Sequence, residues 1–171
     1  DELGVTFTEP HIDLEKVRAF KSRVVSKLTA GLTQLAKQRK VEVLQGRASF
    51  LSPNLIAVFK PDGGHDEIKF EKAILATGSL PAGLPFAPPS ENIWDSTSAL
   101  DLPSIPEHLL IIGGGYIGME LATVYQALGS KITIVAMNPS LLPGADRALV
   151  MILQKHARLR LQVITLSKKF T

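Results

Sequence analysis

Three glycines with the spacing of a dinucleotide-binding turn, Gly113, Gly115 and Gly118, directly follow the apolar run at residues 109–112. In such a turn the first glycine allows a tight bend, the second lets a pyrophosphate approach the backbone, and the third lets helix and strand pack closely. Unpaired N–H groups at the start of the following helix then bind phosphate without a basic side chain. The pattern predicts dinucleotide binding, and the alternative interpretation is a tight turn in an ordinary α/β protein.

One residue expected of an NAD site is missing from the sequence. About twenty residues after the glycines, such a site carries Asp or Glu, which accepts hydrogen bonds from the ribose hydroxyls. Counting from the turn reaches Val135 and Ala136, and the side chain of Ala136 has no acceptor. An NADP site would need an arginine to bind the 2′-phosphate, and residues 137–140 contain none, so a preference for NADP has no support. Asn138 could make a weaker contact with the ribose. We therefore expect weak NAD binding at a turn that still binds pyrophosphate.

The elements around the glycines form one βαβ unit. A strand at residues 109–112 leads into a helix with apolar residues at positions 117, 121, 124 and 128. Gly129 lies where that helix would end, and the β-branched residues 131–135 predict a second strand. Further along the chain, the pattern predicts a helix over 146–157 and a strand over 161–166.

A long helix is predicted over residues 13–40, which contain eight of the nineteen Lys and Arg residues. Its apolar side chains share one helical face: Leu14, Val17, Val24, Leu28, Leu32 and Leu35. A nucleic-acid site is one interpretation of the basic residues. We favour a solvated helix face, because no recognised nucleic-acid motif accompanies them.

Short strands follow this helix. The periodicity predicts strands at 41–44, 48–51, 55–59 and 67–70, with a turn at 61–64, arranged as a small antiparallel meander. Residues 73–76 are an uninterrupted apolar run, typical of a strand buried on both faces of a parallel sheet. Residues 80–108 hold six of the eleven prolines and predict an extended connection, with a short helical turn after Asp95 and Ser96.

The composition limits the chemistry of the chain. Its 171 residues are 45% hydrophobic, which is enough for a real core, and carry a net charge of +3. The absence of cysteine excludes a disulfide, a thiolate metal site and dithiol redox chemistry within this sequence. No apolar run has the length of a membrane span, and the first residues lack the pattern of a secretory signal, so we expect a cytoplasmic protein that binds neither membranes nor nucleic acid.

Several segments together resemble the interior of dihydrolipoyl dehydrogenases, a branch of the FAD-dependent pyridine nucleotide-disulfide oxidoreductase family. The pair "ATGSLP" (76–81) and "GGGYIGME" (113–120), about thirty residues apart, is characteristic of flavoproteins with an NAD domain inserted into an FAD domain. The other matching segments are "SKLTAGLTQLAKQRKVEVLQGRASF", "IWDSTSAL" and "LLPGADRALV". The resemblance covers nearly the whole chain and implies an α/β fold with parts of two Rossmann-like dinucleotide-binding lobes.

The resemblance also implies where the lobes lie. Residues 1–80 would be a partial FAD-binding lobe with the antiparallel β-meander, and residues 81–107 a proline-rich connection. Residues 108–171 would be a partial NAD-binding lobe of βαβ type. Both lobes lack strands that such domains normally contain, which suggests a piece of a longer chain, although a truncated protein would have the same sequence.

Site residues are implied by the same resemblance. For FAD they are Gly46 and Ala48 on the adenine side, with Thr77, Gly78 and Ser79 near the flavin nucleotide. For NAD they are Gly113, Gly114, Gly115, Tyr116, Ile117 and Gly118. Tyr116 would form a lid over the nicotinamide, and Glu120 would lie near the nicotinamide and the flavin. Ala136 is at the position expected to contact the ribose. The alternatives are a turn glycine at 78, a packed aromatic at 116 and a solvent-facing carboxylate at 120. No catalytic residue and no metal ligand is assigned.

The implied activity is that of a flavoenzyme which passes electrons from a dihydrolipoyl dithiol through a disulfide and FAD to NAD. The family's redox cysteine pair, its first glycine fingerprint for FAD and its His–Glu pair have no counterpart here, so we expect these residues to position cofactors without turning over substrate. In full-length form the implied partners are a second copy and lipoyl-bearing 2-oxo acid dehydrogenase complexes. Two alternatives stay open: a non-catalytic dinucleotide-binding or interaction module, and a related FAD/NAD(P)H reductase.

Overall fold

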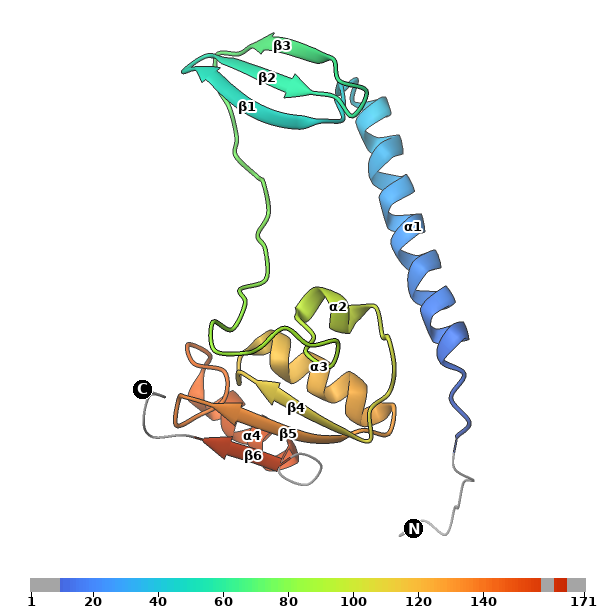
Figure 1. The fold of residues 1–171 in the computed structure, drawn as a ribbon, viewed down its shortest axis with the longest axis vertical. Coiled ribbons are helices and arrows are strands. Elements are labelled where there is room, and N and C mark those ends of the chain that lie inside the picture. The colour runs from blue at the N-terminus through green and yellow to red at the C-terminus, as the bar shows by residue number, and fades with distance from the viewer. Residues whose placement is uncertain (1–9, 158–161, 166–171) are drawn as a thin grey trace. The chain divides into compact units, whose positions relative to one another are not determined.

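The structure is a computed structural model that describes residues 10–157 and 162–165 (Figure 1). The chain divides into two compact units. The meander unit comprises Ala19–Leu80, and the glycine-turn unit comprises Asp1–Arg18 together with Pro81–Thr171. Helix α1, Leu14–Gln38, begins in the glycine-turn unit and continues into the meander unit.

The meander unit contains the expected antiparallel sheet. Its strands are β1 (Arg47–Ser52), β2 (Leu55–Phe59) and β3 (His65–Lys69), in the order β1-β2-β3. The turn between β2 and β3 is closed by a 2.7 Å hydrogen bond from the Lys60 N–H to the Gly64 carbonyl, and Gly63 supplies the positive φ of 92° that the bend requires. Buried Ala57 and Val58 on the central strand form the small apolar centre of this sheet.

Two expected strands are not formed in the meander unit. Residues 41–44 are irregular, because the backbone at this point ends α1: Lys40 takes a left-handed φ of 55°, and the Val41 N–H donates to the Ala36 carbonyl at 2.9 Å. Residues 73–76 have no strand partner in the described part of the chain, and Ile74 and Leu75 are 93% and 72% exposed. An apolar run becomes a buried parallel strand only where neighbouring strands accept its backbone hydrogen bonds.

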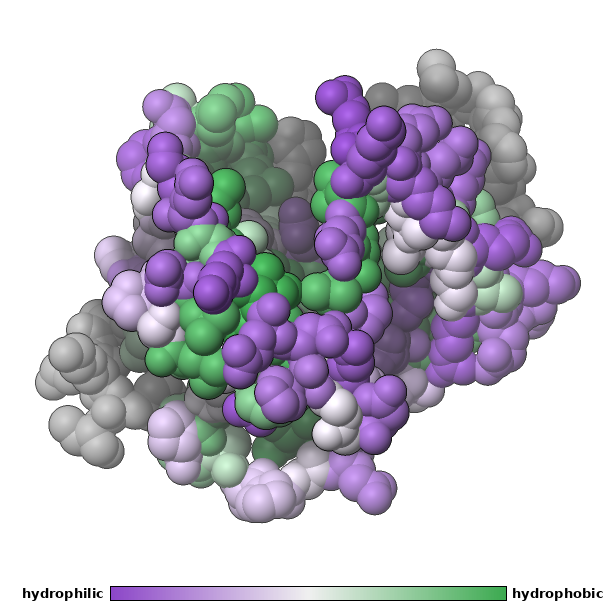
Figure 2. Space-filling model, turned by 90° about the horizontal axis from the view of Figure 1, so that it is seen from above, coloured by the Kyte–Doolittle hydropathy of each residue, from purple (hydrophilic) through white to green (hydrophobic). Residues whose placement is uncertain are grey.

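Helix α1 presents apolar side chains to solvent along much of its length. None of its residues is buried. Its exposed large apolar residues are Phe20, Val24, Val25, Leu28, Leu32 and Leu35. Figure 2 shows apolar residues at the surface of the described part of the chain. At the start of the helix, Leu14 and Val17 belong to the glycine-turn unit and pack against its core.

The glycine-turn unit is built on a parallel sheet with the order β4-β5-β6. Its elements are α2 (Ser96–Leu100), β4 (His108–Ile112), α3 (Tyr116–Ala127), β5 (Lys131–Ala136), α4 (Arg147–Ala157) and β6 (Gln162–Thr165). Helix α3 packs on β4 and β5, and Ile132 and Ile134 from β5 are buried beneath it. The predicted βαβ unit is therefore confirmed, and the predicted final strand is present at the residues that the structure describes.

The connection that precedes β4 is tied to α3 by Tyr125. The Tyr125 side chain is fully buried, its hydroxyl donates to the Ala99 carbonyl at 2.8 Å, and its ring lies 5.9 Å from that of Trp94. Burial raises the pKa of Tyr125, against a smaller opposing influence from the charge of Arg18. The Arg18 guanidinium donates to the carbonyls of Leu102 and Pro103 and so joins α1 to the same connection.

The short helical turn predicted after Asp95 and Ser96 is present as α2, and it begins at a capping box. The Asp95 carboxylate accepts from the N–H groups of Thr97 and Ser98, at 3.0 and 2.8 Å. The Ser98 hydroxyl in turn accepts from the Asp95 N–H at 2.9 Å. The bonds to the carboxylate lower the pKa of Asp95: first the one from the Ser98 N–H, then the one from the Ser98 hydroxyl at 2.8 Å, and last the one from the Thr97 N–H.

Candidate dinucleotide site

The three glycines of the turn meet three different physical requirements. Gly113 has a φ of 120°, which bends the chain out of β4 while its N–H still donates to the Val135 carbonyl at 2.8 Å. At Gly118 a Cβ would lie 2.3 Å from the Gly113 carbonyl oxygen, so α3 can approach β4 only without a side chain there. A Cβ on Gly115 would meet no protein atom within 4 Å, which leaves open space in front of the backbone at that position.

The N-terminus of α3 offers unpaired hydrogen-bond donors. Gly115 is its N-cap residue, in extended conformation and with no side chain to cap the helix. The first N–H of the helix to find a main-chain acceptor is that of Met119, which donates to the Gly115 carbonyl at 3.0 Å. Within the described ranges, the N–H groups of residues 116–118 have no acceptor. Three such donors at the positive end of a helix dipole, beside open space at Gly115, form a site suited to a pyrophosphate.

The side of this site next to β5 is packed with apolar groups. Gly114 is buried, and a Cβ there would lie 2.7 Å from Leu141 Cδ2 and 3.1 Å from the Ala136 Cβ. Ala136 ends β5 and is 4% exposed. The Gly114 carbonyl accepts from the Leu142 N–H at 2.8 Å. The loop after β5 therefore lies against the glycine turn, where the ribose-binding acid of an NAD site was expected.

The remaining residues predicted for NAD lie on the first turns of α3. Tyr116 is 69% exposed and Ile117 is 44% exposed, so neither is packed into the described core. Glu120 is also exposed, one turn after Tyr116. The structure thus brings the predicted residues 113–118, Glu120 and Ala136 together around one helix N-terminus.

The residues predicted for FAD belong to the meander unit and are not joined into one site there. Gly46 packs against β2, where an added Cβ would lie 2.4 Å from the Phe59 carbonyl oxygen. Ala48 pairs with Val58 in the sheet. Thr77, Gly78 and Ser79 are exposed and outside regular secondary structure, with Gly78 at a φ of 73°.

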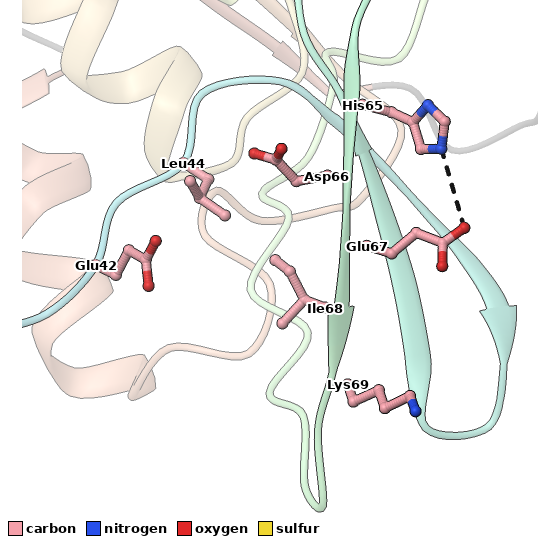
Figure 3. Close-up of a pocket in the computed structure, with 7 residues that line it drawn as sticks. All are labelled: Glu42, Leu44, His65, Asp66, Glu67, Ile68 and Lys69. Carbon is pink, nitrogen blue, oxygen red and sulfur yellow. Dashed lines mark ion pairs between the residues drawn. The ribbon is translucent and has the colours of Figure 1, made fainter.

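An open hollow lies elsewhere in the meander unit, between β3 and the segment that follows α1 (Figure 3). Its lining residues are Glu42, Leu44, His65, Asp66, Glu67, Ile68 and Lys69. Asp66 and Ile68 point toward Leu44, whereas His65 and Glu67 point to the other side of the strand. The Asp66 carboxylate is paired with Lys60 Nζ at 2.8 Å, so this charge is already balanced within the sheet.

Sequence reasoning missed the residues that hold the loop after β5. Leu141 covers Gly114, Leu142 binds its carbonyl, and the Arg147 guanidinium binds several loop oxygens. The segment "LLPGADRALV" resembles the family, but nothing in its local pattern indicates which turn it contacts. Among the described residues no three His, Asp or Glu side chains are grouped as a metal site requires. No described helix is long and apolar enough to cross a membrane.

Comparison with known proteins places this arrangement in a family. Curated relatives include the dihydrolipoyl dehydrogenase of Haemophilus influenzae, 45% identical over 166 residues, and that of Vibrio cholerae, 48% identical over 160 residues. The alignments cover 96% and 92% of this chain but 35% and 33% of the relatives. The chain therefore spans about a third of the length of the curated relatives it matches.

Solved structures agree with the sequence relatives. LpdA from Mycobacterium tuberculosis superposes with a TM-score of 0.81 at 26% identity, over 96% of this chain and 37% of that one. The HOCl-induced flavoprotein disulfide reductase RclA from Escherichia coli superposes with a TM-score of 0.77 at 31% identity, over 91% of this chain and 36% of that one. The sequence profile of the pyridine nucleotide-disulphide oxidoreductases matches residues 5–168, so the resemblance noted from the sequence is confirmed and the chain belongs to that family.

Proposed function

We propose that this chain forms a cofactor-positioning part of a dihydrolipoyl dehydrogenase. The observation that carries the proposal is the α3 N-terminus, where the N–H groups of residues 116–118 have no acceptor in the described part of the chain and a Cβ on Gly115 would meet nothing within 4 Å. That arrangement suits the pyrophosphate of a dinucleotide. The names of the relatives at 45% and 48% identity favour this enzyme over a non-catalytic module or another reductase.

The family uses FAD and NAD, and the glycine-turn unit fits the second of these. Residues 113–118 would hold the pyrophosphate through main-chain N–H groups, and Ala136 would lie beside the adenosine ribose. Exposed Tyr116 and Glu120 would face the nicotinamide half of the cofactor. Bound NAD supplies the hydride acceptor of the family reaction, and the residues of this chain bind and orient it.

The meander unit would contribute to the FAD site. The proposal assigns Gly46 and Ala48 to the adenine side and Thr77, Gly78 and Ser79 to the flavin nucleotide. The chain would then consist of an FAD lobe at 1–80, a connection at 81–107 and an NAD lobe at 108–171. The support is the family match across residues 5–168, which covers the connection and most of both lobes.

The dithiol chemistry of the full reaction needs residues outside this sequence, because the 171 residues contain no cysteine. The purified chain should therefore bind nucleotide but form no NADH from dihydrolipoamide and NAD. A complete enzyme would act on lipoyl groups of 2-oxo acid dehydrogenase complexes, as a homodimer in the cytoplasm. These partners and this location belong to the proposal by analogy with the relatives.

A nucleotide titration tests the proposal most directly. We expect the chain to bind ADP-ribose and, weakly, NAD, with Gly115→Val abolishing both because its side chain would enter the space kept open for the pyrophosphate. Gly31→Val, at an exposed helix glycine of the meander unit with no neighbour within 4 Å, is the matched control and should leave binding unchanged. The proposal is wrong if the chain binds neither nucleotide, or if it produces NADH from dihydrolipoamide by itself.

A further inference from the structure

The loop between β5 and α4, residues 137–146, is folded against the glycine turn. Leu141 is 1% exposed, and its Cδ2 atom lies 2.7 Å from the point where a Cβ on Gly114 would be. The next residue, Leu142, donates its N–H to the Gly114 carbonyl at 2.8 Å. The loop thus forms one wall of the turn, on the side where β5 ends at Ala136.

The backbone of this loop is held in an unfavourable conformation. Leu142 has a φ of 49°, in the left-handed region that residues with a Cβ rarely adopt, and Gly144 follows at 96°. Such a conformation persists only where surrounding contacts determine it. Leu142 is therefore both the left-handed residue of the loop and the donor to the Gly114 carbonyl.

One side chain binds the loop at several points. Arg147, the first residue of α4, donates from Nη1 to the Ser140 hydroxyl at 2.6 Å and from Nη2 to the Leu142 carbonyl at 2.5 Å. It also donates to the Ala145 carbonyl from Nη2 at 2.7 Å and from Nε at 3.0 Å. A planar guanidinium can form this set of bonds at once, and a lysine ammonium cannot.

We propose that Arg147 is a positioning residue for the adenosine half of the dinucleotide site. By binding the Ser140 hydroxyl and the Leu141 carbonyl before the left-handed Leu142, and the Leu142 and Ala145 carbonyls after its N–H, it keeps that N–H on Gly114 and Leu141 over the turn. The inference rests on the proposed function. Because position 136 is an alanine and provides no carboxylate to orient the ribose, binding of the adenosine half depends more on the shape of this loop. The Arg147 donors face loop oxygens, so the residue acts through the loop and not as a phosphate ligand.

The test combines amide exchange with nucleotide binding in the full chain. Arg147→Ala removes the side chain, and Arg147→Lys keeps the charge but loses the planar guanidinium and its several N–H donors. The control is Lys155→Ala, which removes a cation from the same helix. In both Arg147 variants we expect deuterium exchange at the Leu142 amide to accelerate about tenfold. Affinity for ADP-ribose should fall roughly five- to thirtyfold, as expected when a charged hydrogen-bond network is lost. Lys155→Ala should change neither quantity.

Chemical rescue separates positioning from a general loss of structure. Ethylguanidinium added to Arg147→Ala should restore much of the ADP-ribose affinity, and ethylammonium should not, because only the former can bridge the loop oxygens. Wild-type affinity in Arg147→Lys, unchanged exchange at Leu142, or weakened binding without rescue would overturn the proposal. If the unsubstituted chain fails to bind ADP-ribose, the proposed function itself is wrong, and that outcome is visible before any variant is compared.

Discussion

The Cβ atom of Ala136 lies 3.1 Å from the point where a Cβ on Gly114 would be. The end of β5 and the glycine turn therefore meet in an apolar contact, at the place where an NAD site normally has a carboxylate. Ala136 is 4% exposed, so the contact is closed to water. A longer side chain at position 136 would therefore have to displace this contact.

Replacing Ala136 by glutamate should strengthen NAD binding roughly ten- to a hundredfold, because a hydrogen bond to a charged acceptor is worth about 1.5 to 3 kcal/mol. Calorimetric or fluorescence titration measures the change, and NADP should stay a poor ligand. The free energy of unfolding of the ligand-free protein should fall, since a carboxylate replaces a buried methyl group.

Ala136→Gln is the matched control, because it has the length of glutamate without its charge, and it should give a smaller gain. An unchanged NAD affinity in Ala136→Glu would show that position 136 does not contact the ribose. A preference of the wild-type protein, which carries Ala136, for NADP over NAD would also show that position 136 does not contact the ribose.

Replacing Gly118 or Gly115 by alanine should distinguish the glycine needed for packing from the glycine needed for nucleotide binding. Gly118→Ala should lower the free energy of unfolding by about 1–3 kcal/mol, because its Cβ would lie 2.3 Å from the Gly113 carbonyl oxygen. Gly115→Ala should leave stability nearly unchanged, since no protein atom lies within 4 Å, and yet weaken NAD binding. Urea unfolding and nucleotide titration of both variants check this, and equal stability losses would contradict it.

Tyr125→Phe should destabilise the protein by about 1 kcal/mol at neutral pH, because the buried Ala99 carbonyl loses its 2.8 Å hydrogen bond. Burial raises the pKa of Tyr125 above its usual 10.0. The unfolded chain therefore loses this proton first, and the stability contributed by Tyr125 is full below pH 10 and lost as pH rises through the folded-state pKa. The stability gap between the two proteins should narrow above pH 10; a constant gap in urea titrations would contradict this assignment.

Asp95→Asn keeps a side-chain acceptor for the N-terminus of α2 but removes the charge. Hydrogen bonds from Ser98 lower the pKa of Asp95 below 3.8, so its contribution is present above that value and lost as pH falls through the folded-state pKa. The wild-type protein should be the more stable at neutral pH, and the difference should disappear in acid. Thermal unfolding at several pH values measures this. Asp62→Asn, whose carboxylate accepts from the Gly64 N–H in a turn, serves for comparison.

The unit from β4 to β5 could be predicted from the sequence because its signals are local. The strand at 109–112, the glycines at 113–118 and the helical period that follows lie within thirty residues, and each element depends mainly on its own residues. The structure places β4 at His108–Ile112 and α3 at Tyr116–Ala127, close to those expectations. The same local information identified Ala136 as the residue at the end of the second strand.

Tertiary structure decided the features that depend on distant partners. Residues 73–76 have the composition of a buried strand, but composition supplies no neighbouring strand to accept the hydrogen bonds, and the run stays exposed. The wall beside the glycine turn needs Leu142 to meet Gly114, twenty-eight residues earlier, and Arg147 to hold a left-handed backbone. A sequence pattern reports the period of a segment and its apolar face; which carbonyl an amide reaches depends on how the chain returns to that place.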